Sequence, residues 1–268
     1  MDIIFVIILG GLWGSFANVC IYRLPLSKGV VSGRSFCPNC KKLITWKDNI
    51  PIISFLFLNG KCRNCKKKIS SQYLIIELIT IFYFLVIYYL FGISITTLLF
   101  LILGLSFIII FFIDLKHYII PNVLTFSLMI IGFIKSFDPN LNPIFPNFIN
   151  SLIGGIFGYL LIWSIITFYN SISKLNRKHD FFKNIFRQNE GMGLGDAKLL
   201  SVIGFWFGWI SIPFVIFLSS IIALLFVIPS LIKKSKKLSS QIPFGPYIII
   251  GTLIYLIFES NIQSIIFY

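Results

Sequence analysis

Apolar runs of about the length of a bilayer-spanning helix recur along this chain and are separated by polar segments. A hydrocarbon core of about 30 Å requires about 20 apolar residues per crossing helix. Within lipid the backbone must satisfy its own hydrogen bonds, which excludes irregular structure. Only 12% of the residues are charged, against about 25% in soluble domains. The sequence therefore predicts an all-α polytopic membrane protein and excludes an ordinary soluble domain.

We expect eight transmembrane helices from these runs. One apolar stretch is too long for a single crossing, and we divide it at 208–213, where Gly208 and Pro213 suit a tight turn. No internal repeat is evident in the sequence. The expected spans are 3–19, 74–91, 97–113, 119–134, 148–169, 197–209, 212–232 and 244–258.

The basic residues predict the orientation of these spans. If the spans alternate from an outside N-terminus, 22 of the 23 Lys and Arg fall on one side, and only Lys135 falls on the other. Because basic loops are retained in the cytoplasm, we expect both termini outside the bacterial cytoplasmic membrane. Positive charge follows the first span instead of preceding it, so we expect 3–19 to be a retained helix and not a cleaved signal peptide.

The net charge of +14 could also suggest a nucleic-acid-binding protein. However, segment 23–72 holds eleven Lys and Arg against the single acid Asp48, and it lies between two apolar runs. Basic loops in this position contact anionic membrane lipids. We therefore expect anionic lipids, and no nucleic acid, as partners. The basic tract 233–237 is interpreted as a further topology anchor.

Two C-x-x-C pairs lie in the first expected cytoplasmic loop, Cys37 with Cys40 and Cys62 with Cys65. Each pair can direct two thiolates at one metal, and their 21-residue spacer only slightly exceeds that of known zinc sites. A loop of this size cannot form a sufficient core of its own, so metal ligation would stabilise it. Because four thiolates leave no open position, we predict a structural Zn²⁺.

Two other interpretations of these cysteines are disulfides and a redox dithiol. A cytoplasmic location argues against both, since thiols are kept reduced there and no thioredoxin-like βαβ pattern surrounds either pair. The fifth cysteine, Cys20, follows the first span alone, and we expect it to be a small buried apolar residue.

Two acids lie at the ends of expected spans. Asp114 ends the third span, and Asp196 precedes the sixth, after glycines 191, 193 and 195. An ionisable group at a membrane boundary is costly unless it faces protein or water. Taken singly, Asp114 could be a solvated helix end and Asp196 a helix N-cap. Because the two spans run in opposite directions, both carboxyl groups are expected at the same, cytoplasmic boundary.

Two adjacent carboxyl groups cannot both ionise readily, so one proton is shared between them. In an aspartic-protease arrangement, one group takes a proton from the attacking water while the other polarises the peptide carbonyl. The glycines before Asp196 leave room for a substrate backbone. Schemes with a covalent nucleophile fit less well, because His117 and His179 have no G-x-S-x-G or similar setting.

Further short motifs lie along nearly the whole chain. They are GSFANV at 14–19, YRLP at 22–25, DNIP at 48–51, Gly60-Lys61-Cys62, Glu77, the stretch 114–121, Gly-x-Gly-Asp at 193–196 with Lys198, and IPFGPY at 242–247. Gly-x-Gly-Asp alone is a weak signal, but the combination is specific. Through these motifs the chain resembles the bacterial type IV prepilin peptidases, bifunctional leader peptidases and N-methyltransferases of pilus and type II secretion systems.

The resemblance implies that Asp114 and Asp196 are the catalytic pair of a membrane aspartic peptidase, with Gly193, Gly195 and Lys198 in support. It implies that type IV prepilins and pilin-like pseudopilins are cut at the cytoplasmic face, after a short basic leader. Proline and glycine at 243–246 could start the last span or bend it beside the active site, and both interpretations stay open.

The resemblance also implies that S-adenosylmethionine methylates the new terminal amine. The zinc loop would be required for this step, and Gly60 and Lys61 match positions implicated in it. No Gly-rich nucleotide-binding pattern is present, so the methyl-donor site does not follow from spacing. The basic segment 171–190 is longer than expected for the family, and could lie on headgroups or cover the site near Asp196.

Three other functions were weighed. A peptidase without methyl transfer is disfavoured by the intact four-cysteine loop. A proton-coupled transporter is disfavoured because Asp114 and Asp196 lie at one face and the halves show no repeat. A zinc-stabilised scaffold would leave the glycines before Asp196 without a purpose. The expected domains are the first transmembrane helix at 1–22, the zinc-binding loop at 23–73 and a seven-helix peptidase domain at 74–268.

Overall fold

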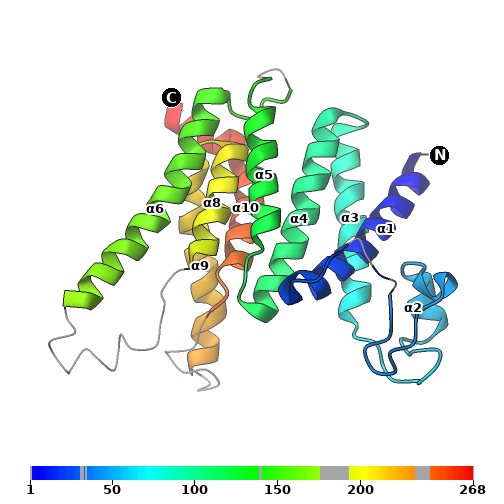
Figure 1. Ribbon diagram of the computed structural model, residues 1–268. Helices are drawn as coiled ribbons and strands as arrows, with labels where there is room; N and C mark the ends of the chain where they lie inside the picture. The colour runs from blue at the N-terminus through cyan, green and yellow to red at the C-terminus, as the bar shows by residue number, and fades with distance from the viewer. Residues whose placement is uncertain are drawn as a thin grey trace. The chain divides into compact units, whose positions relative to one another are not determined.

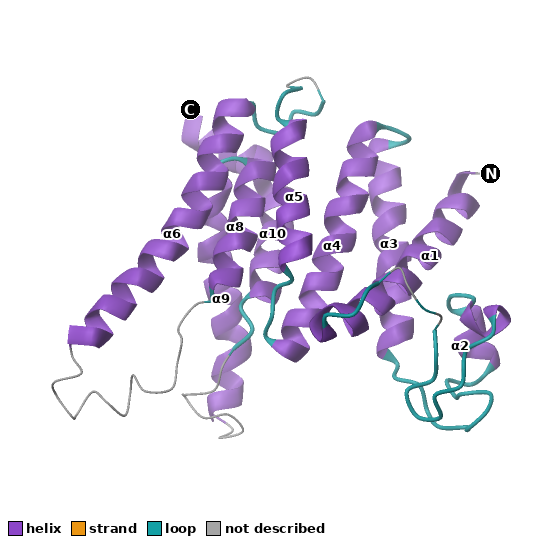
Figure 2. Cartoon of the chain, in the orientation of Figure 1, coloured by secondary structure: helices purple, strands orange, loops and turns teal. Residues whose placement is uncertain are grey.

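The computed structural model describes residues 2–30, 33, 35–138, 141–175, 193–232 and 242–267. These residues form nine α-helices and two short 3-10 helices, and they contain no strand (Figures 1 and 2). The prediction of an all-α chain is confirmed. By its internal contacts the chain divides into two units, Met1–Ile113 and Asp114–Tyr268.

The first unit is built around two long helices that pack closely, α1 and α3. A Cβ added at Gly10 or Gly14 of α1 would lie 2.9 or 2.8 Å from a backbone Cα of α3, so only glycine permits this approach. The Asn18 side chain reinforces the pair by donating to the Tyr73 carbonyl (3.1 Å). The elements of this unit are α1 (Asp2–Arg23), η1 (Leu24–Leu26), η2 (Trp46–Asn49), α2 (Ile53–Phe57), α3 (Gln72–Phe91) and α4 (Ile95–His117), whose last turn enters the second unit.

The second unit is organised around α8, which packs against both α6 and α5, while α9 packs against α10 (Figure 1). Leu199, Leu200, Ile203 and Trp206 of α8 are fully buried, which explains why this short helix forms the core. The Trp206 ring nitrogen donates to the Leu128 carbonyl of α5 (2.8 Å). The other helices are α5 (Asn122–Lys135), α6 (Phe148–Leu175), α8 (Leu194–Phe207), α9 (Ser211–Ile232) and α10 (Gly245–Phe267).

We expect Gly204→Ala to destabilise the second unit. Gly204 of α8 faces Gly154 of α6, and an added Cβ would overlap the Gly154 carbonyl. Alanine favours helices by about 1 kcal/mol over glycine, but overpacking against a rigid backbone costs about 1–3 kcal/mol. Thermal unfolding in detergent should therefore show a lower Tm, whereas Ser127→Ala at an exposed position of α5 should not. An unchanged Tm for Gly204→Ala would contradict the close α6–α8 contact.

Five described helices are long and apolar enough to cross a membrane: α1, α3, α4, α6 and α9. Two more, α5 and α10, are apolar but shorter, and α8 has 14 residues. Each expected span thus coincides with a helix, while the number of eight crossings stays a prediction. The apolar stretch is divided by a turn as predicted, but the turn covers only 208–210, where Gly208 has a φ of 80°, and Pro213 lies in the first turn of α9, which begins at Ser211.

Some predictions concern residues outside those that the structure describes. These are most of the basic segment 171–190, Gly191 and the basic tract 233–237. The three expected domains, 1–22, 23–73 and 74–268, also stay predictions. The expectation for Cys20 is confirmed, since its side chain is buried in α1.

Candidate functional site

The four cysteines predicted to bind zinc lie together in the first unit. All four Sγ atoms fall within 4.8 Å of one another, with Cys37 and Cys65 separated by 3.9 Å and Cys40 and Cys62 by 4.0 Å. Four sulfurs at tetrahedral positions around one zinc are about 3.8 Å apart, given a Zn–S bond of about 2.3 Å. The cluster therefore fits a single zinc ion bound by four thiolates.

The two C-x-x-C turns have the same backbone conformation. In the first, the Lys41 N–H donates to the Cys37 carbonyl (2.9 Å), and in the second the Lys66 N–H donates to the Cys62 carbonyl (2.9 Å). Lys41 and Lys66 both adopt a positive φ, 60° and 57°, which closes each turn. Two equivalent turns thus each present two sulfurs, as the sequence spacing predicted.

A bidentate ion pair joins η2 to the second turn. Nε and Nη2 of Arg63 donate to the Asp48 carboxylate at 2.7 to 3.0 Å. The hydrogen bonds from Arg63 hold the pKa of Asp48 below its ordinary value. Because the Arg63 side chain is 62% exposed, this pair contributes little to stability and mainly fixes the loop conformation.

Gly60 and Lys61 lie between α2 and the second cysteine turn. Gly60 has a φ of 63°, and its N–H donates to the Phe55 carbonyl (2.8 Å). An added Cβ would lie 3.0 Å from the Phe55 ring, so both conformation and space require glycine here. Lys61 is exposed and pairs with Lys68 in an isolated antiparallel bridge. The role of Gly60 and Lys61 in methyl transfer stays a prediction.

Asp114 lies in the last turn of α4, and its side chain is only 4% exposed. Its Oδ2 atom accepts a hydrogen bond from the backbone N–H of Gly245 (3.0 Å), the first residue of α10. A Cβ at position 245 would lie 2.7 Å from this oxygen, so a glycine is needed for the contact. Asp114 is therefore not the solvated helix end that was one of its two interpretations.

Asp196 lies in the first turn of α8, and its side chain is 8% exposed. Its Oδ2 atom accepts a hydrogen bond from the backbone N–H of Gly193 (3.2 Å). The residue before the helix is Gly193, so the N-cap interpretation of Asp196 is wrong and the carboxyl group lies inside the helix start. The helix N-terminus there favours a negative charge.

The segments that hold the two carboxyl groups contact one common side chain in the second unit. The Ile120 side chain lies between Gly195, which precedes Asp196, and Gly245, whose N–H binds Asp114. Its atoms would be 3.1 Å from a Cβ added at Gly195 and 3.3 Å from a Cβ added at Gly245. One apolar side chain thus contacts the segment that carries Asp196 and the segment that binds Asp114.

Lys198 follows Asp196 on α8, but its ammonium group contacts α5. Its Nζ atom donates to Oδ1 of Asn122 (2.7 Å), the first residue of α5, and lies 5.4 Å from the centre of the Phe126 ring. The contact joins the starts of α5 and α8. Sequence reasoning assigned no role to Ile120, Asn122 or the Gly245 N–H, although Ile120 lies in the motif at 114–121 and Gly245 in the motif at 242–247.

We expect Gly245→Ala to lower the rate of any reaction that depends on Asp114. Alanine keeps the N–H donor, but its Cβ would force Asp114 or the start of α10 to move. A misplacement of about 1 Å can cost about 10²-fold in rate. The control is Ser127→Ala, which introduces alanine at an exposed position of α5. In steady-state assays, kcat should fall in the first variant and stay near that of the unsubstituted protein in the second; equal kcat values would contradict the packing at Gly245.

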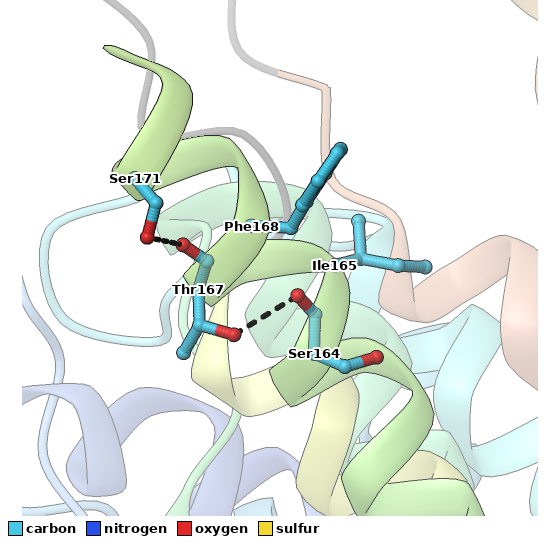
Figure 3. A pocket seen from close by; sticks show the side chains of 5 residues that line it. All are labelled: Ser164, Ile165, Thr167, Phe168 and Ser171. Carbon is cyan, nitrogen blue, oxygen red and sulfur yellow. Dashed lines mark hydrogen bonds between the residues drawn. The ribbon is translucent and has the colours of Figure 1, made fainter. Parts of the chain in front are cut away.

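A surface hollow on α6 is lined by residues that belong to neither site. It is lined by Ser164, Ile165, Thr167, Phe168 and Ser171, all from that one helix (Figure 3). The hydroxyl groups of Thr167 and Ser171 donate to carbonyl groups of α6 itself (both 2.9 Å). Because none of the lining residues is a predicted site residue, the hollow gives no support for a methyl-donor site at Gly60 and Lys61.

Comparison with protein families gives two matches in succession along the chain. Residues 8–91 match the bacterial peptidase A24 N-terminal domain, and residues 99–228 match the type IV leader peptidase family. A relative from Vibrio cholerae is 36% identical over 90% of this chain and 90% of its own length. The chain belongs to the type IV leader peptidase family. No solved structure matches it.

Other members of the family are similar over nearly the whole chain. A protein of Aeromonas salmonicida is 32% identical over 93% of this chain and 88% of its own length. One of Pseudomonas aeruginosa is 31% identical over 96% of this chain and 90% of its own length. Both, like the Vibrio cholerae protein, are named prepilin leader peptidase/N-methyltransferase. The resemblance inferred from the sequence motifs is confirmed.

Proposed function

We propose that this protein is a prepilin leader peptidase and N-methyltransferase of the bacterial inner membrane. The observation that carries the peptidase activity is the pair of buried carboxyl groups, Asp114 and Asp196, each bound by a backbone N–H. Membership of the type IV leader peptidase family and the names of the relatives support the same activity. Five long apolar helices support a multi-pass membrane location.

The reaction is peptide hydrolysis by a two-aspartate mechanism. One carboxylate takes a proton from a water molecule as that water attacks the scissile carbonyl. The other, protonated, donates a hydrogen bond to the carbonyl oxygen and helps to protonate the leaving amine. The N–H groups of Gly245 and Gly193 hold the carboxyl oxygens in place without supplying a proton. No covalent intermediate with the enzyme is needed.

The substrates are type IV prepilins and pilin-like pseudopilins with a short basic leader. Cleavage takes place at the cytoplasmic face, and both ends of the chain lie outside, since nearly all basic residues fall on one predicted side. Gly193 and Gly195 leave space beside Asp196, and Lys198 fixes α8 to α5. Anionic lipids contact the basic loops, and nucleic acid has no role.

Methylation of the new terminal amine uses S-adenosylmethionine, and Gly60 and Lys61 act in this step. Cys37, Cys40, Cys62 and Cys65 hold a structural Zn²⁺ that keeps the loop folded. When bound, this zinc supplies structural stability alone, because four thiolates leave no position for substrate. The support for S-adenosylmethionine as methyl donor is the resemblance and the names of the relatives.

The two activities can be separated in one experiment. The purified protein in lipid is incubated with a prepilin, with and without S-adenosylmethionine, and the products are identified by mass spectrometry. We expect leader removal in both reactions, and the added mass of one methyl group only when the donor is present. A prepilin that stays uncut would contradict the peptidase. A cut but unmethylated product in the presence of the donor would contradict methyl transfer alone.

A further inference from the structure

The short helix α2 of the metal-binding loop exposes one apolar face. Ile53, Leu56 and Phe57, spaced to share a side of the helix, are 51%, 61% and 84% exposed. Trp46 of η2, which contacts α2, is 72% exposed. We call these four residues the α2 patch. So many large apolar side chains on a loop of this size mark an interaction surface.

Two contacts fix the start of α2 beside the long helices of the first unit. The backbone N–H of Ile52 donates to the Glu77 carboxylate of α3 (2.7 Å). Pro51 packs on α1, since a Cβ at Gly11 would lie 3.3 Å from its Cβ. Glu77 is buried, and Ile52 adopts a φ of 60°, so this segment is held firmly. The α2 patch therefore follows directly from a segment seated on two helices that can cross a membrane.

Glu77, which holds the start of α2, lies near the first turn of α3. It lies five residues beyond Gln72, the start of α3, which corresponds to about 7.5 Å along the helix. Interfacial helices bury their apolar faces about 5–10 Å into the boundary between headgroups and acyl chains. On the same helix, Ile75 and Leu78 are exposed and would face lipid if α3 crosses the membrane. If the membrane boundary lies near the first turn of α3, the start of α2 lies close to that boundary.

The charge around the α2 patch favours an anionic surface. Segment 23–72 has eleven basic residues against one acid, Asp48, and Arg63 neutralises that acid. The Lys47 ammonium lies 5.6 Å from the centre of the Trp46 ring. Tryptophan and lysine together are typical of membrane interfaces, where the ring meets the apolar boundary and the cation meets the phosphates.

We propose that the α2 patch inserts into the interface of the same membrane that α1 and α3 cross, on the side of the metal-binding loop. Ile53, Leu56, Phe57 and Trp46 contact the acyl boundary, while the surrounding lysines contact anionic headgroups. The metal-binding loop is already attached to the membrane at its two ends, through α1 and α3. The α2 patch then provides a third contact between this loop and the bilayer. This inference depends on α1 and α3 crossing the membrane, and is independent of the catalytic assignments.

Photocrosslinking tests the proposal. The full-length protein carries p-benzoylphenylalanine at position 57, is placed in nanodiscs of mixed phosphatidylcholine and phosphatidylglycerol, and is irradiated and analysed by mass spectrometry. The matched control carries the label at Asn64, an exposed polar position of the same loop. We expect several-fold more lipid adduct at position 57 than at position 64. A metal content equal to that of the unlabelled protein shows that the loop remains folded. If the label at position 57 disturbs the loop, position 56 provides a second labelling site.

Two results would overturn the proposal. The first is equal lipid labelling at both positions. The second is an adduct at position 57 formed with a second copy of the chain, or with an added prepilin, in place of lipid. Lipid labelling requires no catalysis. The test can therefore be interpreted even if the protein proves to have no peptidase or methyltransferase activity.

Discussion

Replacing Asp114 or Asp196 with asparagine is expected to abolish leader cleavage. A carboxamide neither takes a proton from water nor shares one with the second carboxyl group. Loss of general acid–base catalysis lowers kcat by about 10²- to 10⁴-fold. The side-chain oxygen of asparagine can still accept the hydrogen bonds from Gly245 and Gly193, so both variants should remain folded. Leader removal from a purified prepilin, followed by mass spectrometry, measures the effect.

The matched control is Asp2→Asn, which makes the same chemical change at an exposed position at the start of α1. It should leave cleavage unchanged. Expression level, thermal stability and metal content should be the same in all three variants. Full cleavage by either Asp114→Asn or Asp196→Asn would show that the two carboxyl groups are not a catalytic pair.

Replacing both Cys37 and Cys62 with serine is expected to release the metal and to eliminate methyl transfer. Structural zinc sites contribute about 10–16 kcal/mol of binding energy to folding, and the loop lacks a core that could replace it. Leader cleavage should fall much less than methylation, because Asp114 and Asp196 belong to the other unit. Metal content by mass spectrometry, and separate assays of cutting and methylation on the same preparation, check this expectation.

Cys20→Ala is the control for cysteine removal. Cys20 is buried in α1 and lies outside the four-cysteine cluster, so this variant should keep both its metal and its methyl transfer. One zinc ion retained per chain after loss of Cys37 and Cys62 would contradict the ligand assignment. Normal methylation without metal would show that the loop does not need zinc for this step.

Much of the fold could be predicted from the sequence because its signals are local. An apolar run of sufficient length forms a helix whatever its neighbours, so the runs at 74–91 and 148–169 match α3 and α6 closely. The turn between α8 and α9 follows from Gly208, whose positive φ other residues adopt at a cost. The four cysteines come together because each C-x-x-C turn orients two sulfurs by itself.

The surroundings of the two aspartates could not be predicted in the same way. The hydrogen bond from Gly245 to Asp114 joins residues 131 positions apart, and no local pattern encodes such a distance. The alternative interpretation of Asp196 as the N-cap was wrong, because α8 begins one turn earlier, after Gly193. The entry to α10 had two interpretations, and helix initiation agrees with the structure because α10 begins at Gly245, whose N–H also contacts Asp114.

The sequence by itself determined the all-helical class, the family and the residues able to bind zinc, since hydropathy and ligand spacing act over short stretches of chain. Only the tertiary structure decided that Ile120 lies between the neighbours of the two carboxyl groups, that Asn122 holds Lys198 and that Glu77 holds the start of α2. These contacts join helices far apart in the chain, and they depend on glycine positions where backbones approach within a few ångströms.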